Sequence, residues 1–282
     1  GKTTSVSNYT TDAYGFNVNY GIPMSEFNRL NFGVGVQSTR LKVGSENELP
    51  IEIRNFLQSF QDPNSTHANT SENFQEVTVA LGWSHNSLDR YVFPENGLSH
   101  GISSLVSAPG SDLQYYRLSY YLQYYKYLTH GFVGMLSTNL GYGNGYGKTK
   151  NLPFYKNFFA GGSHSVRGFE ESSLGPRDSR NNPFGGNFVA TGTAALILPE
   201  FIAPGTRAVR TAVFVDAGQA YFVHNRSDFA GPENPDELRY AAGVSLTWMT
   251  PMAPLVFSLA TPLNEKPGDH VQKFSFTFGT VF

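Results

Sequence analysis

The sequence of 282 residues contains no cysteine, no long apolar run and little charge. Without cysteine, the chain has no disulfide framework, no thiolate nucleophile and no cysteine-ligated zinc or iron–sulfur cluster. No stretch of about 18 apolar residues is present, so a transmembrane helix is excluded. Lysine and arginine number 20 against 22 acidic residues, and the formal net charge of -2 gives no reason to expect a nucleic acid as partner.

Residue patterns that carry catalysis or metal binding are also missing. The seven histidines are scattered, without the i, i+4 spacing of a helical metal site. The glycine-rich stretch "GYGNGYG" (141–147) has no following helix whose N-terminus would bind a phosphate. The polar stretch 62–73 lacks the glycine and the distal glutamate of a calcium loop, and G-x-S-x-G does not occur. We therefore interpret the chain as non-enzymatic and expect neither a cofactor nor a metal.

What the chain has in abundance is glycine, aromatic residues and alternation, with 29 Gly, 23 Phe and 16 Tyr. In "AYGFNVNYGIP" (13–23), Tyr14, Phe16 and Val18 share one face of a strand, and glycine and asparagine share the other. Most such segments run roughly 9 to 13 residues, close to the length that lets a tilted strand cross a bilayer. The pattern predicts about eleven strands, at residues 14–22, 30–37, 76–88, 98–106, 115–127, 132–142, 187–197, 209–221, 238–248, 255–261 and 271–282.

The connections and the polar face distinguish a membrane barrel from a soluble one. Long connections at about 44–73, 143–186 and 222–237 alternate with short ones, as in outer-membrane barrels. Soluble sandwiches and lipocalin-like barrels also alternate, but their water-facing side usually carries many lysines and glutamates. Here the polar face carries Gly, Asn, Ser, Thr and Gln, and charged residues make up 15% of the chain. We therefore predict an all-β fold, an antiparallel transmembrane β-barrel, with a short surface helix within residues 49–60.

Several segments together resemble one family. They are "NSLDRYVFPENG" (86–97), "LPFYKNFFAGG" (152–162), "VRGF" (166–169), "WMTPMAPLVFSLATPL" (248–263) and "FSFTFGTVF" (274–282). Over nearly the whole chain, they resemble the barrel of the BamA family, the central subunit of the outer-membrane β-barrel assembly machine. The VRGF tetrapeptide alone is shared with sister transporters, such as two-partner secretion pores and chloroplast import channels.

The resemblance implies a part of a larger barrel and a role in assembly. The family barrel has sixteen strands behind periplasmic POTRA domains, so residues 1–282 would be the C-terminal part of a single transmembrane β-barrel domain, without the N-terminal strands and the POTRA domains. The implied function is to fold and insert β-barrel clients into the outer membrane of a Gram-negative bacterium. The implied partners are unfolded outer-membrane proteins, accessory lipoproteins of the machine and the lipid bilayer. A VRGF-class secretion transporter, a diffusion porin and an inactive, self-associating fragment are the alternatives.

By the same resemblance, the loop 143–186 folds back into the lumen and carries the motif Val166, Arg167, Gly168 and Phe169. Arg167 would then meet carboxylates on the barrel wall, one of which matches Asp216. The second position departs from the family, because the expected glutamate falls on Ala195. Either Asp216 alone holds the guanidinium or Glu200 takes part. Judged by its own sequence context, Arg167 would be a loop arginine in solvent.

The last strand carries a second hypothesis. Phe274, Phe276, Phe278 and Phe282 share one face, and the terminal aromatic resembles the signal by which outer-membrane proteins are recognised for assembly. In the family, this strand pairs weakly with the first one and leaves a lateral seam toward lipid, and Gly279 would weaken pairing further. An unpaired strand edge can template an incoming strand. The alternative is a closing strand whose aromatic side chains anchor in lipid.

Overall fold

The computed structural model describes residues 2–6, 9–44, 49–60, 71–199, 208–223 and 237–279. Twelve antiparallel strands form one sheet, in which each strand pairs with the next one along the chain. They are β1 (Lys2–Val6), β2 (Tyr9–Pro23), β3 (Asn28–Val43), β4 (Ser71–Asn86), β5 (Gly97–Ser107), β6 (Tyr115–Thr129), β7 (Phe132–Gly145), β9 (Phe188–Ile197), β10 (Val209–Tyr221), β11 (Arg239–Met249), β12 (Pro254–Pro262) and β14 (Phe274–Phe278).

Shorter elements lie in the connections. The helix α1 (Ile51–Gln58) precedes β4, and the 3-10 turn η2 (Phe154–Lys156) follows β7. The two-residue strands β8 (Gly168–Phe169) and β13 (Val271–Gln272) pair with each other in a separate small sheet. In the part of the chain that the structure describes, no helix is long and apolar enough to span a membrane.

The antiparallel β-fold predicted from the alternation is confirmed, and two details differ from the pattern. β1 was not predicted, because its sequence "KTTSV" has no apolar alternation. The predicted strand 271–282 is divided at Lys273, because β13 pairs with β8 while β14 pairs with β12. Phe282, the last of the predicted aromatic residues, lies outside the described residues.

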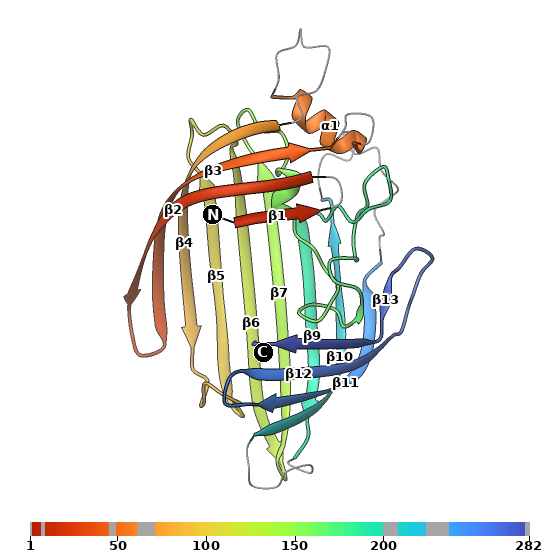
Figure 1. The fold of residues 1–282 in the computed structure, drawn as a ribbon. Helices are drawn as coiled ribbons and strands as arrows, with labels where there is room; N and C mark the ends of the chain where they lie inside the picture. The colour runs from red at the N-terminus through yellow and green to blue at the C-terminus, as the bar shows by residue number, and fades with distance from the viewer. Residues whose placement is uncertain are drawn as a thin grey trace.

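The sheet curls around a lumen (Figure 1). Its outward face carries many exposed apolar side chains. On β2 and β3, Phe16 opposes Val36 and Val18 opposes Val34, and all four side chains are exposed. The same holds for Leu136 on β7, Val213 and Val215 on β10 and Phe274, Phe276 and Phe278 on β14. Exposed apolar residues in such a continuous band suit contact with lipid rather than with water.

The described sheet is open. Its order begins at β1 and ends at β14, and no pairing within the described residues joins these two strands. Figure 1 shows β1 to β3 at one margin of the curled sheet and β12 at the other.

Two clusters of buried side chains fill the lumen side of the sheet. In the first cluster, Ile53 and Leu57 of α1 pack with wall residues and with Leu152 and Phe154. The expected surface helix therefore packs its apolar face on the wall at the long-loop end of the sheet, while Ile51 and Asn55 stay exposed (Figure 1). In the second cluster, side chains from the connection between β7 and β9 (residues 146–187, here called the lumen loop) pack against Val189, Ala220 and Ala241 of the wall. The lumen loop thus folds inward, as the family resemblance implied.

Candidate functional site

The strongest polar contact between the lumen loop and the wall joins Arg167 to Asp216. Arg167 Nε donates to Asp216 Oδ2 at 2.8 Å, and Nη2 donates to Oδ1 at 2.8 Å. The backbone N–H of Arg167 also donates to Oδ2, at 3.0 Å. Thr193 Oγ1 on the neighbouring strand donates to Oδ1 at 2.8 Å. The Asp216 side chain is 0% exposed, so these four hydrogen bonds are what compensates a carboxylate removed from water.

An aromatic ring completes this site. Phe214 points to the lumen two residues before Asp216, and the Arg167 Cζ atom lies 3.2 Å from the centroid of its ring. The guanidinium therefore lies on the ring face, a favourable cation–π arrangement. Arg167, Asp216, Thr193 and Phe214 are called the Arg167 site below.

The strand register shows where Ala195 lies relative to the Arg167 site. Phe214 opposes Ala195, and Asp216 opposes Thr193, in the pairing of β9 with β10. Where the family resemblance led us to expect a glutamate, a methyl group lies opposite the Phe214 ring. The arginine thus has one carboxylate, one hydroxyl neighbour and one ring around it. Glu200, the other candidate partner, lies outside the described residues.

The rest of the VRGF motif places the arginine. Val166 and Phe169 are buried among Leu174, Val189 and Ala220. Gly168 has a φ of 94°, which L side chains rarely adopt. A Cβ at Gly168 would also lie 3.2 Å from the Ala241 Cβ. The two apolar residues therefore fix the loop against the wall, and the glycine permits the turn that leaves Arg167 directed at β10.

The motif also contacts the chain that leads into the last strand. In the β8–β13 pair, Phe169 opposes Val271 and Gly168 opposes Gln272. The Glu170 N–H donates to the His270 carbonyl at 2.9 Å. Arg177, further along the lumen loop, donates to the Gly268 carbonyl at 3.0 Å. Sequence reasoning missed this contact, because a two-residue pairing between segments about 100 residues apart leaves no periodic signal.

The lumen loop has a second anchor on the opposite part of the wall. Lys156 Nζ lies 3.6 Å from Glu76 Oε2, and Tyr115 Oη donates to the same oxygen at 2.8 Å. Glu76 lies on β4 and Tyr115 on β6, and the Glu76 side chain is 0% exposed. Burial lowers the pKa of Lys156, and the neighbouring Glu76 opposes that shift. The loop is therefore held to β4 and β6 at one end and to β9 and β10 at the other.

The predicted seam residues lie on the outer face at the end of the sheet. Phe274, Phe276 and Phe278 are exposed, and they oppose Leu259, Phe257 and Leu255 of β12. Gly279 has a φ of 91°, and its N–H donates to the Pro254 carbonyl at 2.9 Å. The structure brings none of these residues to the Arg167 site directly. β13, two residues upstream of β14, makes the connection through β8.

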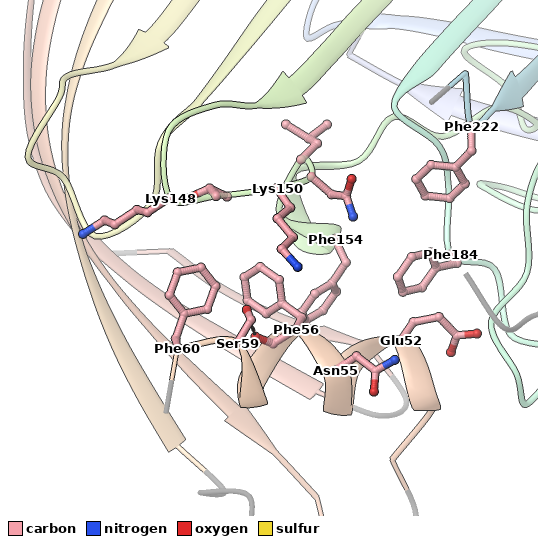
Figure 2. Close-up of a pocket in the computed structure, with 13 residues that line it drawn as sticks. Glu52, Asn55, Phe56, Ser59, Phe60, Lys148, Lys150, Phe154, Phe184 and Phe222 are labelled. Atoms are coloured by element: carbon pink, nitrogen blue, oxygen red, sulfur yellow. Dashed lines mark hydrogen bonds between the residues drawn. The ribbon is translucent and has the colours of Figure 1, made fainter. Parts of the chain in front are cut away.

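A cavity of about 510 Å³ lies beside α1 at the long-loop end of the barrel. Rings of Phe56, Phe60, Phe154 and Phe184 line it, and Figure 2 shows the Lys150 side chain reaching toward the rings of Phe56 and Phe154. No group of three or more metal-ligating His, Asp or Glu side chains occurs within the described residues. The contacts of Arg167 and Lys156 brace the lumen loop against the wall.

An inward-folded loop and an outward apolar band are features of an outer-membrane β-barrel. The model of the Omp85 superfamily domain matches residues 1–282, and the chain belongs to this superfamily. The chain is therefore an outer-membrane protein of a Gram-negative bacterium, and the predicted family, fold class and location are confirmed.

Individual relatives of the chain are outer membrane protein assembly factors. The chain is 33% identical over 301 residues to the outer membrane protein assembly factor BamA of Neisseria meningitidis serogroup B, across 99% of this chain and 37% of that protein. It is 30% identical over 137 residues to BamA of Nitratidesulfovibrio vulgaris, across 47% of this chain and 16% of that protein. The chain thus spans well under half the length of these relatives.

The chain is also similar to solved protein structures. BamA from Haemophilus ducreyi lacking POTRA domains 1–3 has a TM-score of 0.83 and 30% identity, covering 95% of this chain and 54% of that one. CdiB from Escherichia coli has a TM-score of 0.59 at 14% identity, which shows a shared fold alone.

Proposed function

We propose that this chain is the barrel part of a longer protein that folds and inserts β-barrel clients into the outer membrane. The relatives with the printed role of outer membrane protein assembly factor support this, since the alignment with one of them covers 99% of the chain. As proposed, the process requires no catalytic residue and no cofactor, because strand exchange trades one set of backbone hydrogen bonds for another.

The observation that carries the proposal is the limited pairing of β14. Five residues of β14 pair with β12, whereas nine pairs join β11 to β12. Within the described residues, the other edge of β14 pairs with no strand, and a lateral seam needs such an edge because its backbone groups must pair with a client strand. The β8–β13 pair gives that strand a support apart from its own ladder.

We further propose that unfolded outer-membrane proteins are the clients and that accessory lipoproteins bind the longer protein, mainly through POTRA domains. The lipid bilayer is the third partner, contacted through the outward apolar band.

The filled lumen argues against the diffusion porin. The two buried clusters place loop side chains where a porin would hold water. A secretion transporter shares the fold, as the CdiB likeness shows, but that likeness carries no functional argument.

The test is client folding into liposomes by the full-length protein, with β14 locked by a disulfide. One variant joins a cysteine at Ser275 to a cysteine on the first strand of the complete barrel. The matched control joins Ser258→Cys to Ser275→Cys, which oppose each other in the β12–β14 register and lock the other edge of β14.

We expect the seam lock to abolish acceleration of client folding, reduction to restore it, and the control lock to leave it unchanged. Equal folding with the seam locked would contradict the seam. If the unlocked protein does not accelerate folding at all, the assembly function itself is wrong.

A further inference from the structure

A shallow groove of about 620 Å³ crosses the outer face of β6, β7, β9 and β10. Its lining includes Tyr124, Lys126, Gly134, Leu136, Ala194 and Val213. Leu136 and Val213 are exposed, whereas Phe214 and Asp216, which alternate with Val213 and Val215 along β10, are buried on the lumen side. The groove therefore faces lipid, directly behind the wall that carries the Arg167 site.

Two small residues make the groove. In the β7–β9 register, Gly134 opposes Leu196 and Leu136 opposes Ala194, so that Gly134 and Ala194 lie diagonally beside each other. A Cβ at Gly134 would meet nothing nearer than the Leu128 Cδ1 atom at 3.7 Å, an ordinary van der Waals contact. The glycine is thus not required by crowding, and the space above it is open. Four adjacent strands span about 14 Å at their usual spacing, which suits one acyl chain lying across them.

One end of the groove is positively charged. Lys126 opposes Gly134 in the β6–β7 register and lies three residues before the end of β6 at Thr129. The Lys126 side chain is exposed, and no ion pair to it occurs within the described residues. The connection after β6 is a short one, which in outer-membrane barrels lies on the periplasmic side. Lys126 is therefore at the level where lipid headgroups of the periplasmic leaflet lie, with Tyr124 as an interfacial aromatic residue on the same face.

We propose that this groove is a binding site for an anionic glycerophospholipid of the periplasmic leaflet, with one acyl chain over Gly134 and Ala194 and the headgroup phosphate on the Lys126 ammonium. Charge complementarity selects the lipid, since a basic side chain at the membrane surface attracts anionic headgroups. The site rests on the outer-membrane location and not on the assembly activity.

The test is native mass spectrometry of the full-length protein after exchange into micelles that contain phosphatidylglycerol or phosphatidylcholine. Lys126→Gln removes the charge, and Gly134→Leu fills the groove. Lys148→Gln is the matched control, because Lys148 is an exposed lysine on the lumen loop, outside the groove. Lys126→Arg keeps the charge. Heat-modifiability on gels shows that each variant is folded.

We expect one retained phosphatidylglycerol, a preference over phosphatidylcholine that falls about fivefold in Lys126→Gln, and loss of both lipids in Gly134→Leu. Lys126→Arg and Lys148→Gln should behave as the unmodified protein. Equal effects of Lys126→Gln and Lys148→Gln would overturn the proposal, as would unchanged retention by folded Gly134→Leu or retention of lipopolysaccharide in place of the phospholipid.

Discussion

At the scale of single residues, Asp216 is the centre of the Arg167 site. Its two oxygens accept four hydrogen bonds, from Arg167 and Thr193, and it has no access to water. A buried ion pair of this kind adds little stability relative to an apolar pair, but removal of one partner leaves an uncompensated charge. The Arg167 site should therefore affect stability mainly when one of its two charged partners is removed.

We predict that Arg167→Ala in the full-length protein lowers the free energy of unfolding by about 3 to 5 kcal/mol and reduces client assembly. The measurement is heat-modifiability on gels together with assembly yield in cells. The control is Arg90→Ala, which breaks an exposed pair with Glu95 and should cost less than about 1 kcal/mol. Arg167→Lys should recover only part of the loss, since lysine cannot make the bidentate contact.

A double-mutant cycle with Asp216→Asn tests the same contact. Each single change leaves the other group without its partner. The double variant should therefore lose less free energy of unfolding than the sum of the two single losses, by about 1 kcal/mol or more. Strict additivity would show that Arg167 and Asp216 do not act on each other.

At the scale of elements, the β4–β5 turn is built around Asp89. Asp89 Oδ1 accepts the N–H groups of Glu95 and Asn96 at 3.0 and 3.2 Å. Partial burial by itself would raise the pKa of Asp89, but these two N–H groups and the nearby Arg90 lower it below the usual value. The turn also reaches distant strands, since Arg210 at the start of β10 donates to the Pro94 carbonyl.

A lowered carboxyl pKa gives a signed prediction. Asp89 stabilises the folded state at pH values above its unfolded pKa, and this contribution is lost as the pH falls through the folded pKa. The Tm of the unmodified protein should therefore exceed that of Asp89→Asn near neutral pH, by an amount that reflects less than about 1 kcal/mol. The difference should vanish in strong acid. A Tm difference that does not change with pH would contradict this role.

Elements differed in how far the sequence predicted them. Period-two alternation identifies strands whose faces meet lipid and lumen, which is why β2 to β7 and β9 to β12 overlap the predicted segments. It is silent on β1, whose sequence is polar, and it could not divide residues 271–278, because the alternation continues through Lys273 while the hydrogen-bond partner changes. Helix α1 lies within the predicted residues 49–60, but the wall residues on which it packs are distant in sequence and could not be read from the local pattern.

The site was predicted in part, for a similar reason. Arg167 and Asp216 came from a motif. Phe214 shares the parity of Asp216 and could have been found by it, whereas Thr193 depends on the register between β9 and β10. The β8–β13 pair and the Lys156–Glu76 contact depend on how a long loop folds, which local pattern does not encode.

At the scale of the whole molecule, the lumen loop is attached to two separate parts of the barrel wall. The lumen loop is fixed to β4 through Lys156 and to β10 through Arg167, and α1 packs beside it. A barrel filled in this way should be a poor conductor of ions.

We predict that the full-length protein in planar bilayers shows low conductance, and that Arg167→Ala raises it by releasing one end of the lumen loop. Single-channel recording measures both, with Arg90→Ala as the control that should remain low. Steady, large conductance of the unmodified protein would instead favour the diffusion porin.

The β8–β13 pair also sets an order in time. Glu170 is synthesised 100 residues before His270, its partner beside that pair. The β8–β13 contacts of the VRGF segment therefore cannot form until nearly the whole chain has entered the barrel, because the last strands bring those partners with them. Contacts so far apart in sequence form late. A barrel that stalls before β13 can therefore form the contacts of its lumen loop to β4 and β10, but it lacks the β8–β13 pair that ties the loop to the last strands.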